Sequence, residues 1–517
     1  MSHDYASKML ACWRGKAVGG TLGQTFEGLE GPLDADFYHP VPSGMVPNDD
    51  LDLQVLYACV LDQEPEPRVD RHRLAQAWAD HVAFPWNEYG VGMRNLAEGL
   101  QPPLTGSYDN WFTCGEGAAI RSELWACLAP GDPDLAAAYA YEDACFDHAG
   151  DGIVAAQLLA RMQALAFRHH DAERGTIERI LDQALAATDP TSGIAGVVSD
   201  VRRWHTEGLS WQAVRERIVA AYAGDDFTDV RPNTGFVVLG LLAGHDFAER
   251  ILITNNCGFD TDSTTATVGA LLAILDPASI PARWLAPIGD DLVLNPEITG
   301  IEAPPSIAAF ADLVARLRDR IAGRAPDPAP DGGEPTSVRG LAVGRAWVST
   351  DRETWEGRDL TGLPHPGAPL PDFGVPSEQT ELPGTWTRMR REEFASPILL
   401  LTYPLDGRGS EQVRLVVNCT EHMRVWLDGG YLFGAQGSQY LFPSPHSAPL
   451  GQFIDIDLPA GAHELTIAIR RPPRHRDVAE WVVGLAERPS MLWVPFAMRT
   501  TTEPIGAAPV SGDAPGR

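Results

Sequence analysis

Residues 256–275 read NCGFDTDSTTATVGALLAIL, and this stretch decides how the first part of the chain folds. A turn at Asn256-Cys257-Gly258 precedes two aspartates, Asp260 and Asp262, and a run of Ala, Leu and Gly that ends near Leu275. Small residues of this kind suit a helix that packs closely against its neighbours. The stretch therefore predicts a helix of a large bundle with two carboxylates at its start.

Helical signals continue through residues 1–322. Apolar side chains recur at three- and four-residue spacing between Asp50 and Leu61, as they do on one face of a helix. Asp132-Pro133 opens another helix with proline at its first position, and Asp246 to Glu249 form a capping-box pattern. Strand-type alternation is scarce in this part of the chain. We therefore predict an all-α domain over residues 1–322.

The periodicity changes after residues 323–337, which read GRAPDPAPDGGEPTS and predict a linker. Beyond them, apolar and polar residues alternate with a period of two. The expected strands include residues 398–403, 413–418, 423–427, 454–458, 465–469 and 481–485, with turns at Asp428-Gly429-Gly430 and Pro459-Ala460-Gly461. This pattern predicts an antiparallel β-sandwich over residues 338–500, of the jelly-roll or galactose-binding-like kind. Residues 501–517 are rich in Gly, Ala and Pro and are predicted to be a disordered tail.

Aromatic residues of the predicted sandwich allow two interpretations. They could form a face that binds carbohydrate, or they could pack in the core or between domains. The residues concerned are Trp347, Trp426, Tyr431 and Trp481.

Charge and composition exclude several functional classes. The 517 residues carry 70 acidic and 40 basic side chains, a formal charge of −30, which argues against nucleic acid or an anionic membrane surface as a partner. We expect a cytoplasmic protein, because no signal peptide and no apolar run of about 20 residues is present. Seven scattered cysteines without a C-x-x-C pair fit free thiols in a reducing compartment.

Two acidic segments are the candidates for chemistry. Asn48-Asp49-Asp50 stands directly before a predicted helix, and Asp260-Thr261-Asp262-Ser263 before another. A carboxylate at a helix start is often only a cap, so a structural explanation remains open for each segment alone. If the two segments meet, four carboxylates would repel one another unless a cation lies between them. Oxygen ligands without His or Cys favour a hard ion such as Mg²⁺, Mn²⁺ or Ca²⁺.

Six segments together resemble the ADP-ribosylglycohydrolase family over about residues 6–320. Residues 14–23, RGKAVGGTLG, are similar to the family's opening helix, and residues 26–28, FEG, to the loop that bears a glutamate. Residues 48–50 stand where the family has Thr-Asp-Asp, and residues 115–121, GEGAAIR, resemble its Gly-Asn-Gly-Ala-Ala-Met-Arg segment. His148 is shared with the segment that follows, and residues 258–263, GFDTDS, are similar to Gly-Gly-Asp-Thr-Asp-Thr.

The resemblance implies an orthogonal α-helical bundle with two Mg²⁺ ions (Mn²⁺ as an alternative) and cleavage of a bond at the ribose anomeric carbon. It implies metal ligands at Asn48, Asp49, Asp50, Asp260, Asp262 and Ser263. Glu27 would be a mobile acidic residue near the metals, so the implied catalytic set is Glu27, Asp49, Asp50, Asp260 and Asp262. Substrate contacts are implied for Glu116, Gly117, Arg121 and His148, although Arg121 could instead pair with an acidic neighbour and His148 could be structural.

Departures from the family pattern affect the expected substrate. Asn48 replaces a threonine, Gly20 replaces an aspartate, and Glu116 replaces an asparagine. An added carboxylate disfavours a diphosphate, so a neutral ribosyl or other furanosyl glycoside competes with ADP-ribose. We therefore expect a metal-dependent hydrolase of an N- or O-glycosidic bond, whose substrate is a small-molecule or protein-linked glycoside. The alternative from another class is a non-catalytic family member in which the sandwich is the binding part.

Overall fold

The computed structural model describes residues 3–327 continuously and, beyond them, 338–339, 342–349, 362–382, 384–407, 411–438, 441, 443–446, 453–494 and 499–500. The chain divides into two compact units, one of residues 1–93 and 101–328, the other of residues 94–100 and 329–517. Most of the predicted linker and the whole predicted tail lie outside the described residues, so those boundaries remain predictions.

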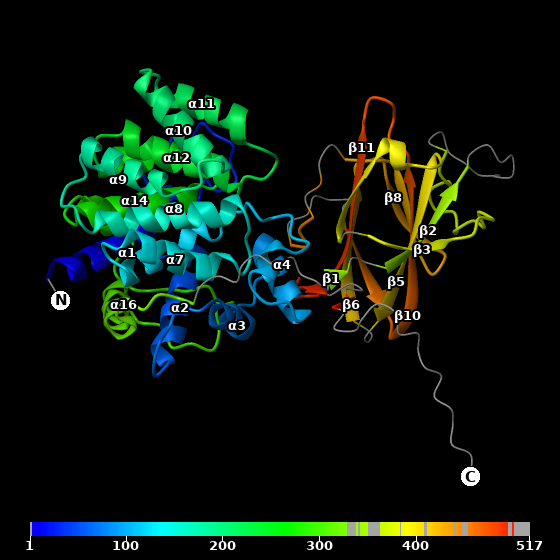
Figure 1. The fold of residues 1–517 in the computed structure, drawn as a ribbon, viewed down its shortest axis with the longest axis horizontal. Helices are drawn as coiled ribbons and strands as arrows, with labels where there is room; N and C mark the ends of the chain where they lie inside the picture. The colour runs from blue at the N-terminus through cyan, green and yellow to red at the C-terminus, as the bar shows by residue number, and fades with distance from the viewer. Residues whose placement is uncertain are drawn as a thin grey trace, which may run out of the picture. The chain divides into compact units, whose positions relative to one another are not determined.

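The first unit consists of helices, as predicted (Figure 1), and the last residues of one of them, 94–97, are counted with the second unit. The main ones are α1 (His3–Gly23), α2 (Asp49–Gln63), α3 (Arg71–His81), α4 (Asn87–Ala97), α7 (Pro133–Ala144), α8 (Asp151–Ala166), α9 (Arg174–Ala186), α10 (Gly193–Thr206), α11 (Trp211–Tyr222), α12 (Val230–Ala243), α13 (Phe247–Asn256), α14 (Thr261–Leu275) and α16 (Ile307–Ile321). Short helices are α5 (Leu104–Ser107), η1 (Ala119–Arg121), α6 (Glu123–Leu128) and α15 (Ala282–Leu285).

Predicted helix starts agree with the observed ones. Asp132 caps α7, whose first residue is proline, and the Asp246 side chain accepts a hydrogen bond from the Glu249 amide at the start of α13. Among the helices of the described residues, none combines the length and apolar composition that a membrane crossing requires.

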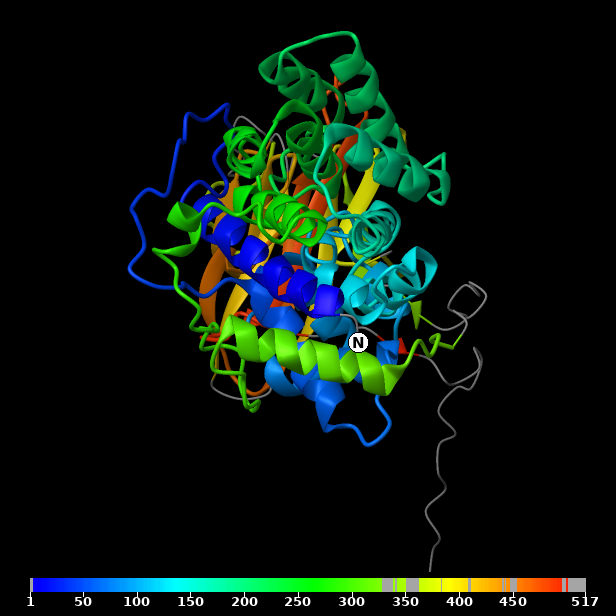
Figure 2. The same ribbon diagram turned by 90° about the vertical axis from the view of Figure 1, so that its left-hand side faces the viewer.

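Helix α14 is buried along its whole length, and α1 lies beside it (Figures 1 and 2). Glycines at every fourth position of α1 make this approach possible. A Cβ atom on Gly15 would lie 2.2 Å from the Gly269 carbonyl oxygen, and one on Gly19 would lie 2.3 Å from that of Thr265. One on Gly23 would lie 2.3 Å from the Asp262 backbone, so this contact reaches the acidic start of α14.

The second unit contains two antiparallel sheets (Figure 1). One has the strand order β3-β2-β5-β10-β7-β8, and the other β12-β11-β6-β9 with β4 paired to β11. Their bounds are β2 (Ala342–Val348), β3 (Glu378–Glu381), β4 (Trp386–Arg390), β5 (Ile398–Gly407), β6 (Glu411–Cys419), β7 (Met423–Leu427), β8 (Gly430–Ala435), β9 (Phe453–Leu458), β10 (Gly461–Arg470), β11 (Val478–Glu487) and β12 (Trp493–Val494). A further pair joins β1 (Val338–Arg339) to β13 (Arg499–Thr500), and η2 (Arg391–Glu393) follows β4.

Alternate residues of both sheets form one apolar core, which confirms the predicted sandwich. Leu399, Leu401, Leu465 and Ile467 of the first sheet share this core with residues of the second, among them Leu415, Val417, Trp481 and Val483. Trp426 and Trp481 are fully buried, and Trp347 and Tyr431 pack against core clusters. Trp426 and Trp481 therefore serve packing, the second of the two interpretations drawn from the sequence, while Trp347 and Tyr431 are only partly buried.

Candidate metal centre

The turn before α14 holds the Glu27 loop against the two aspartates. The Gly28 amide donates a hydrogen bond to the Phe259 carbonyl at 2.9 Å, and the Phe259 amide donates one to the Leu29 carbonyl at 2.7 Å. Gly258 has φ +81°, and a Cβ there would lie 2.5 Å from the Glu30 carbonyl oxygen. Glycine is therefore required for the two strands of chain to approach so closely. This pairing places Glu27 next to Asp260 and Asp262.

Asn48 connects the two acidic segments. Its side-chain oxygen accepts a hydrogen bond from the Asp50 amide at 2.8 Å and so caps α2. Its side-chain nitrogen donates to Asp262 at 3.0 Å, across 214 positions of sequence. Asn48 therefore forms one hydrogen bond to each acidic segment, and coordination of a metal ion by its side-chain oxygen remains a prediction.

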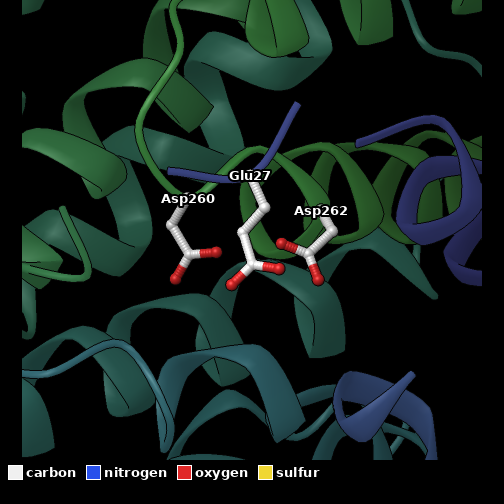
Figure 3. Close-up of side chains that lie close together, drawn as sticks. All are labelled: Glu27, Asp260 and Asp262. Carbon is white, nitrogen blue, oxygen red and sulfur yellow. The ribbon is translucent and has the colours of Figure 1, made fainter. Parts of the chain in front are cut away.

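Carboxylates from three segments of chain converge at this point. Glu27, Asp260 and Asp262 each offer an oxygen such that all three lie within 4.8 Å of one another, and so do Asp49, Asp50 and Asp262. Figure 3 shows Glu27 between the two aspartates, with the three carboxylates directed into the same space. Asp262 belongs to both groups. The two acidic segments predicted from the sequence therefore meet.

Ser263 lies within this cluster. Its hydroxyl donates to Asp260 Oδ1 at 2.8 Å and lies 3.3 Å from Asp50 Oδ1. The hydroxyl oxygen is thereby held among the carboxylates, where the sequence placed a ligand.

The cluster is electrostatically strained without a cation. Burial, followed by the charges of Asp262 and Asp49, raises the pKa of Glu27 to about 8. Burial and the charge of Asp262 raise the pKa of Asp49 to about 7. The pKa values of Asp50, Asp260 and Asp262 are also raised, first by burial and, for Asp50 and Asp260, also by neighbouring carboxylates. Proton uptake or a bound cation would relieve this repulsion.

Two oxygens of the cluster have no hydrogen-bond partner among the described residues. They are Asp50 Oδ2, which lies 3.7 Å from the Lys16 ammonium, and Asp262 Oδ1, which has no ion pair among those residues either; both are buried. A buried carboxylate oxygen without a hydrogen-bond donor destabilises the fold, and a hard cation that coordinates this oxygen removes the penalty. The donor set therefore fits a divalent ion that prefers oxygen ligands.

One buried cation, Lys16 of α1, partly offsets the charge. Its ammonium lies 3.7 Å from Asp50 and 3.2 Å from Glu123, and it donates to the Ile120 carbonyl at 2.6 Å. Glu123 also accepts from Gln54 at 3.0 Å and from Gln163 at 3.1 Å. The sequence prediction gave Lys16 no role of its own. Its position among the small residues of RGKAVGGTLG, residues 14–23, could have indicated that its side chain is buried.

The four residues expected to contact substrate separate into two groups. Glu116 is 2% exposed, its Oε2 has no hydrogen-bond partner among the described residues, and the charges of Asp50 and Asp262 add to burial in raising its pKa. The adjacent Gly117 donates its amide to Glu88 at 3.1 Å. The structure therefore brings Glu116 and its loop toward the acidic cluster.

Arg121 and His148 lie instead in a buried network of ion pairs. Arg121 contacts Asp143 at 2.9 Å and Asp147 at 2.8 Å, and it donates to the Gly117 carbonyl at 2.7 Å. His148 lies 2.7 Å from Asp147 and 3.4 Å from Glu88; burial lowers its pKa, but these two carboxylates outweigh burial and raise the pKa to about 9. Both side chains are fully buried, so their visible contacts support the Gly117 loop from within the protein.

Further residues beside the cluster were missing from the sequence prediction. Tyr89 lies 3.4 Å from Asp49, and Asn233 accepts from the Asp260 amide at 3.4 Å. Single polar residues on separate helices leave no local motif, so only the tertiary structure identifies them.

Comparisons with known proteins found one family model and several solved structures. The family model for ADP-ribosylglycohydrolase matches residues 1–324, more than half of the chain. A solved structure of an ADP-ribosylglycohydrolase-related protein complex is similar at 20% identity over 61% of this chain and 99% of that one, with a TM-score of 0.43.

Weaker similarities are to a β-glucosidase from Kluyveromyces marxianus in complex with glucose and to a PA14 sugar-binding domain from an RTX adhesin. The first has 9% identity over 32% of this chain and 19% of that one, with a TM-score of 0.19. The second has 14% identity over 29% and 92%, with a TM-score of 0.16. The comparison with curated proteins found no match.

Proposed function

We propose that this chain, which belongs to the ADP-ribosylglycohydrolase family, hydrolyses a glycosidic bond at the anomeric carbon of ribose or a related sugar with the help of divalent metal ions. The observation that carries the proposal is the convergence of Glu27, Asp49, Asp50, Asp260 and Asp262 from three segments of chain. Membership of the family supports a glycohydrolase-type activity, and the metal dependence and the substrate are our own proposals.

Two Mg²⁺ ions, with Mn²⁺ as an alternative, would be held by Asp49, Asp50, Asp260 and Asp262, together with the oxygens of Asn48 and Ser263. Asp262 Oδ1, which is buried and has no hydrogen-bond partner among the described residues, supports this choice. Ions bound there would supply Lewis-acid stabilisation of charge on sugar oxygens and on a water molecule.

Glu27 would act as the acid or base of the reaction. The residue as a whole is exposed, but its carboxyl group lies among the buried Asp260 and Asp262 and is held there by the backbone pairing of its loop. Burial is the first cause of the raised pKa of this carboxyl group and does not depend on the charges that bound ions would neutralise, so the group is suited to exchange a proton with a sugar oxygen or water.

Lys16 and Ser263 would position the ligands. The Lys16 ammonium faces Asp50 from behind the cluster, and the Ser263 hydroxyl is hydrogen-bonded to Asp260. Fixed carboxylates require little reorganisation during the reaction, and this preorganisation is usually the largest source of catalysis.

Glu116 bears on the choice of substrate. A buried carboxyl group near the metal ligands disfavours a diphosphate, so we propose that an uncharged ribosyl or other furanosyl glycoside is cleaved better than an ADP-ribosyl compound. Family membership favours the ADP-ribosyl compound, which is therefore the second candidate.

A substrate panel tests the proposal. ADP-ribosyl-arginine, ADP-ribosyl-serine, simple nucleosides and aryl furanosides are each assayed with Mg²⁺ and with EDTA. Turnover that requires metal is expected for the wild type and for Asp312→Ala, an exposed acidic residue of α16, but not for Asp262→Ala. If no compound is cleaved while metal ions are demonstrably bound, the non-catalytic alternative replaces this proposal.

A further inference from the structure

We propose that a pocket in the β unit binds a phosphate group, either as free phosphate or as a phosphate monoester. The pocket has a volume of about 240 Å³ and lies where the segments after β6 and β8 meet the segment after β10. Its lining includes Thr420, Glu421, His422, Gln436, Ser438, Arg470, His475 and Arg476. The proposal rests on this pocket and is independent of the hydrolase activity.

The sequence concentrates positive charge at this place. Residues 470–476 read RRPPRHR, four arginines and a histidine within seven residues of a chain whose formal charge is −30. Such a run is commonly a solvated surface, so its significance depends on where the side chains lie. Three of them, Arg470, His475 and Arg476, line the pocket, while Arg474 does not.

Backbone contacts fix the walls of the pocket. The Arg470 amide donates to the His422 carbonyl at 3.0 Å, and the Ser438 amide donates to that of Cys419 at 3.0 Å. Gly437 has φ +92°, and a Cβ there would lie 2.6 Å from the Thr420 carbonyl oxygen. The segment after β8 can lie this close to Thr420 only because residue 437 is glycine.

Positive charge in the pocket exceeds what its single acidic residue neutralises. Arg476 donates to Glu421 at 3.1 Å and to the Thr420 carbonyl. Arg470 and His475 form no side-chain hydrogen bond or ion pair within the described parts of the chain. Burial raises the pKa of Glu421, and Arg476, Arg470 and His475 oppose that rise. All three basic side chains therefore lie close enough to the Glu421 carboxyl group to interact with it.

Phosphate fits this arrangement better than a carboxylate does. A guanidinium group presents parallel N–H donors that match phosphate oxygens, and Arg470 adds a positive charge that Glu421, paired with Arg476, does not neutralise. The Thr420 and Ser438 hydroxyls and the Gln436 amide supply polar groups around the same space. A group of this size leaves room in the pocket, which is why a monoester is accommodated as well as the free ion.

Calorimetric titration of the full chain tests the proposal, in EDTA so that phosphate cannot coordinate metal in the helical unit. The ligands are inorganic phosphate, ribose 5-phosphate and acetate. We expect saturable binding of one or both phosphates and none of acetate, and tighter binding of ribose 5-phosphate would identify a monoester as the ligand. Arg470→Gln and His475→Gln should each weaken binding, Arg470→Gln by about tenfold or more, since a hydrogen bond to a charged group contributes about 1.5–3 kcal/mol.

Arg474→Gln is the matched control, because it removes the same charge from the same run at an exposed residue outside the pocket. It should bind phosphate like the wild type. The proposal is overturned if Arg474→Gln weakens binding as much as Arg470→Gln, if acetate binds as tightly as phosphate, or if neither phosphate ligand binds. Thermal melting of each variant establishes that it is folded.

Discussion

The contact between α1 and α14 makes a sharp prediction about two adjacent glycines. A Cβ atom at residue 19 would lie 2.3 Å from the Thr265 carbonyl oxygen and 2.5 Å from its carbon. At residue 20 the nearest atom is the Asn48 side-chain nitrogen, at 3.2 Å, which would need to shift by only a few tenths of an ångström. Gly19→Ala should therefore force the helices apart, and Gly20→Ala should not.

The size of the effect follows from the same distances. Because non-bonded atoms rest about 3.5 Å apart, α1 would have to retreat from α14 by about 1 Å in Gly19→Ala. Overpacking of this kind costs about 1–3 kcal/mol. Both variants gain about 1 kcal/mol from replacing glycine by alanine within a helix. That gain cancels in the comparison, so Gly19→Ala should be less stable than Gly20→Ala by about 1–3 kcal/mol.

Urea denaturation followed by circular dichroism at 222 nm, where the helices dominate, measures the difference. The midpoint of Gly19→Ala should fall clearly below that of Gly20→Ala. Since Asp262 begins the same contact, Gly19→Ala should also bind metal more weakly. Equal midpoints for the two variants would mean that the close packing of α1 on α14 is not what holds this part of the bundle.

Three further predictions concern the acidic cluster. A carboxyl group with a raised pKa keeps a proton that the unfolded chain has released, so the metal-free protein should lose stability as pH rises from about 4 toward the pKa of about 7 for Asp49 and about 8 for Glu27. Mg²⁺ should reverse this loss. Melting temperatures that do not fall across this pH range would contradict the prediction. Lys16→Met should lower the free energy of unfolding, measured by urea denaturation, by about 3–5 kcal/mol, because it leaves buried acids without a cation. Adding Glu123→Gln should recover part of the loss. A Lys16→Met variant as stable as the wild type would show that Lys16 is dispensable. Glu27→Gln should lower turnover by about 10²–10⁴-fold, less than Asp262→Ala does, and the reverse order in steady-state kinetics would argue against the assigned roles.

Most of the fold could be predicted from local patterns. The period of the apolar residues separated a helical part from a strand-rich part, and the caps at Asp132 and Asp246 were correct, because such signals depend on neighbours in sequence. The meeting of the two acidic segments could not be derived in this way, since 214 positions separate Asn48 from Asp262. Only the resemblance to a family indicated it.

The surroundings of the cluster were predicted less well. Arg121 and His148 were expected near the substrate, and the structure buries both among ion pairs, in agreement with the structural alternative that the sequence left open. Lys16 belongs to residues 14–23 of the opening helix, and its contact with Asp50 depends on how α1 packs against the rest of the bundle. Burial and ion pairing between distant helices arise from packing, which single-residue signals do not encode.

The most direct test of the proposed metal centre is a calorimetric titration of Mg²⁺ and Mn²⁺ into chelator-treated protein. Asp262→Ala is the decisive variant, because Asp262 belongs to both groups of converging carboxylates, and Asp312→Ala removes an exposed acid of the same unit as a control. We predict saturable binding in the wild type and in Asp312→Ala, and its loss in Asp262→Ala. Unchanged binding in Asp262→Ala, or no binding in the wild type, would contradict a metal centre at this cluster.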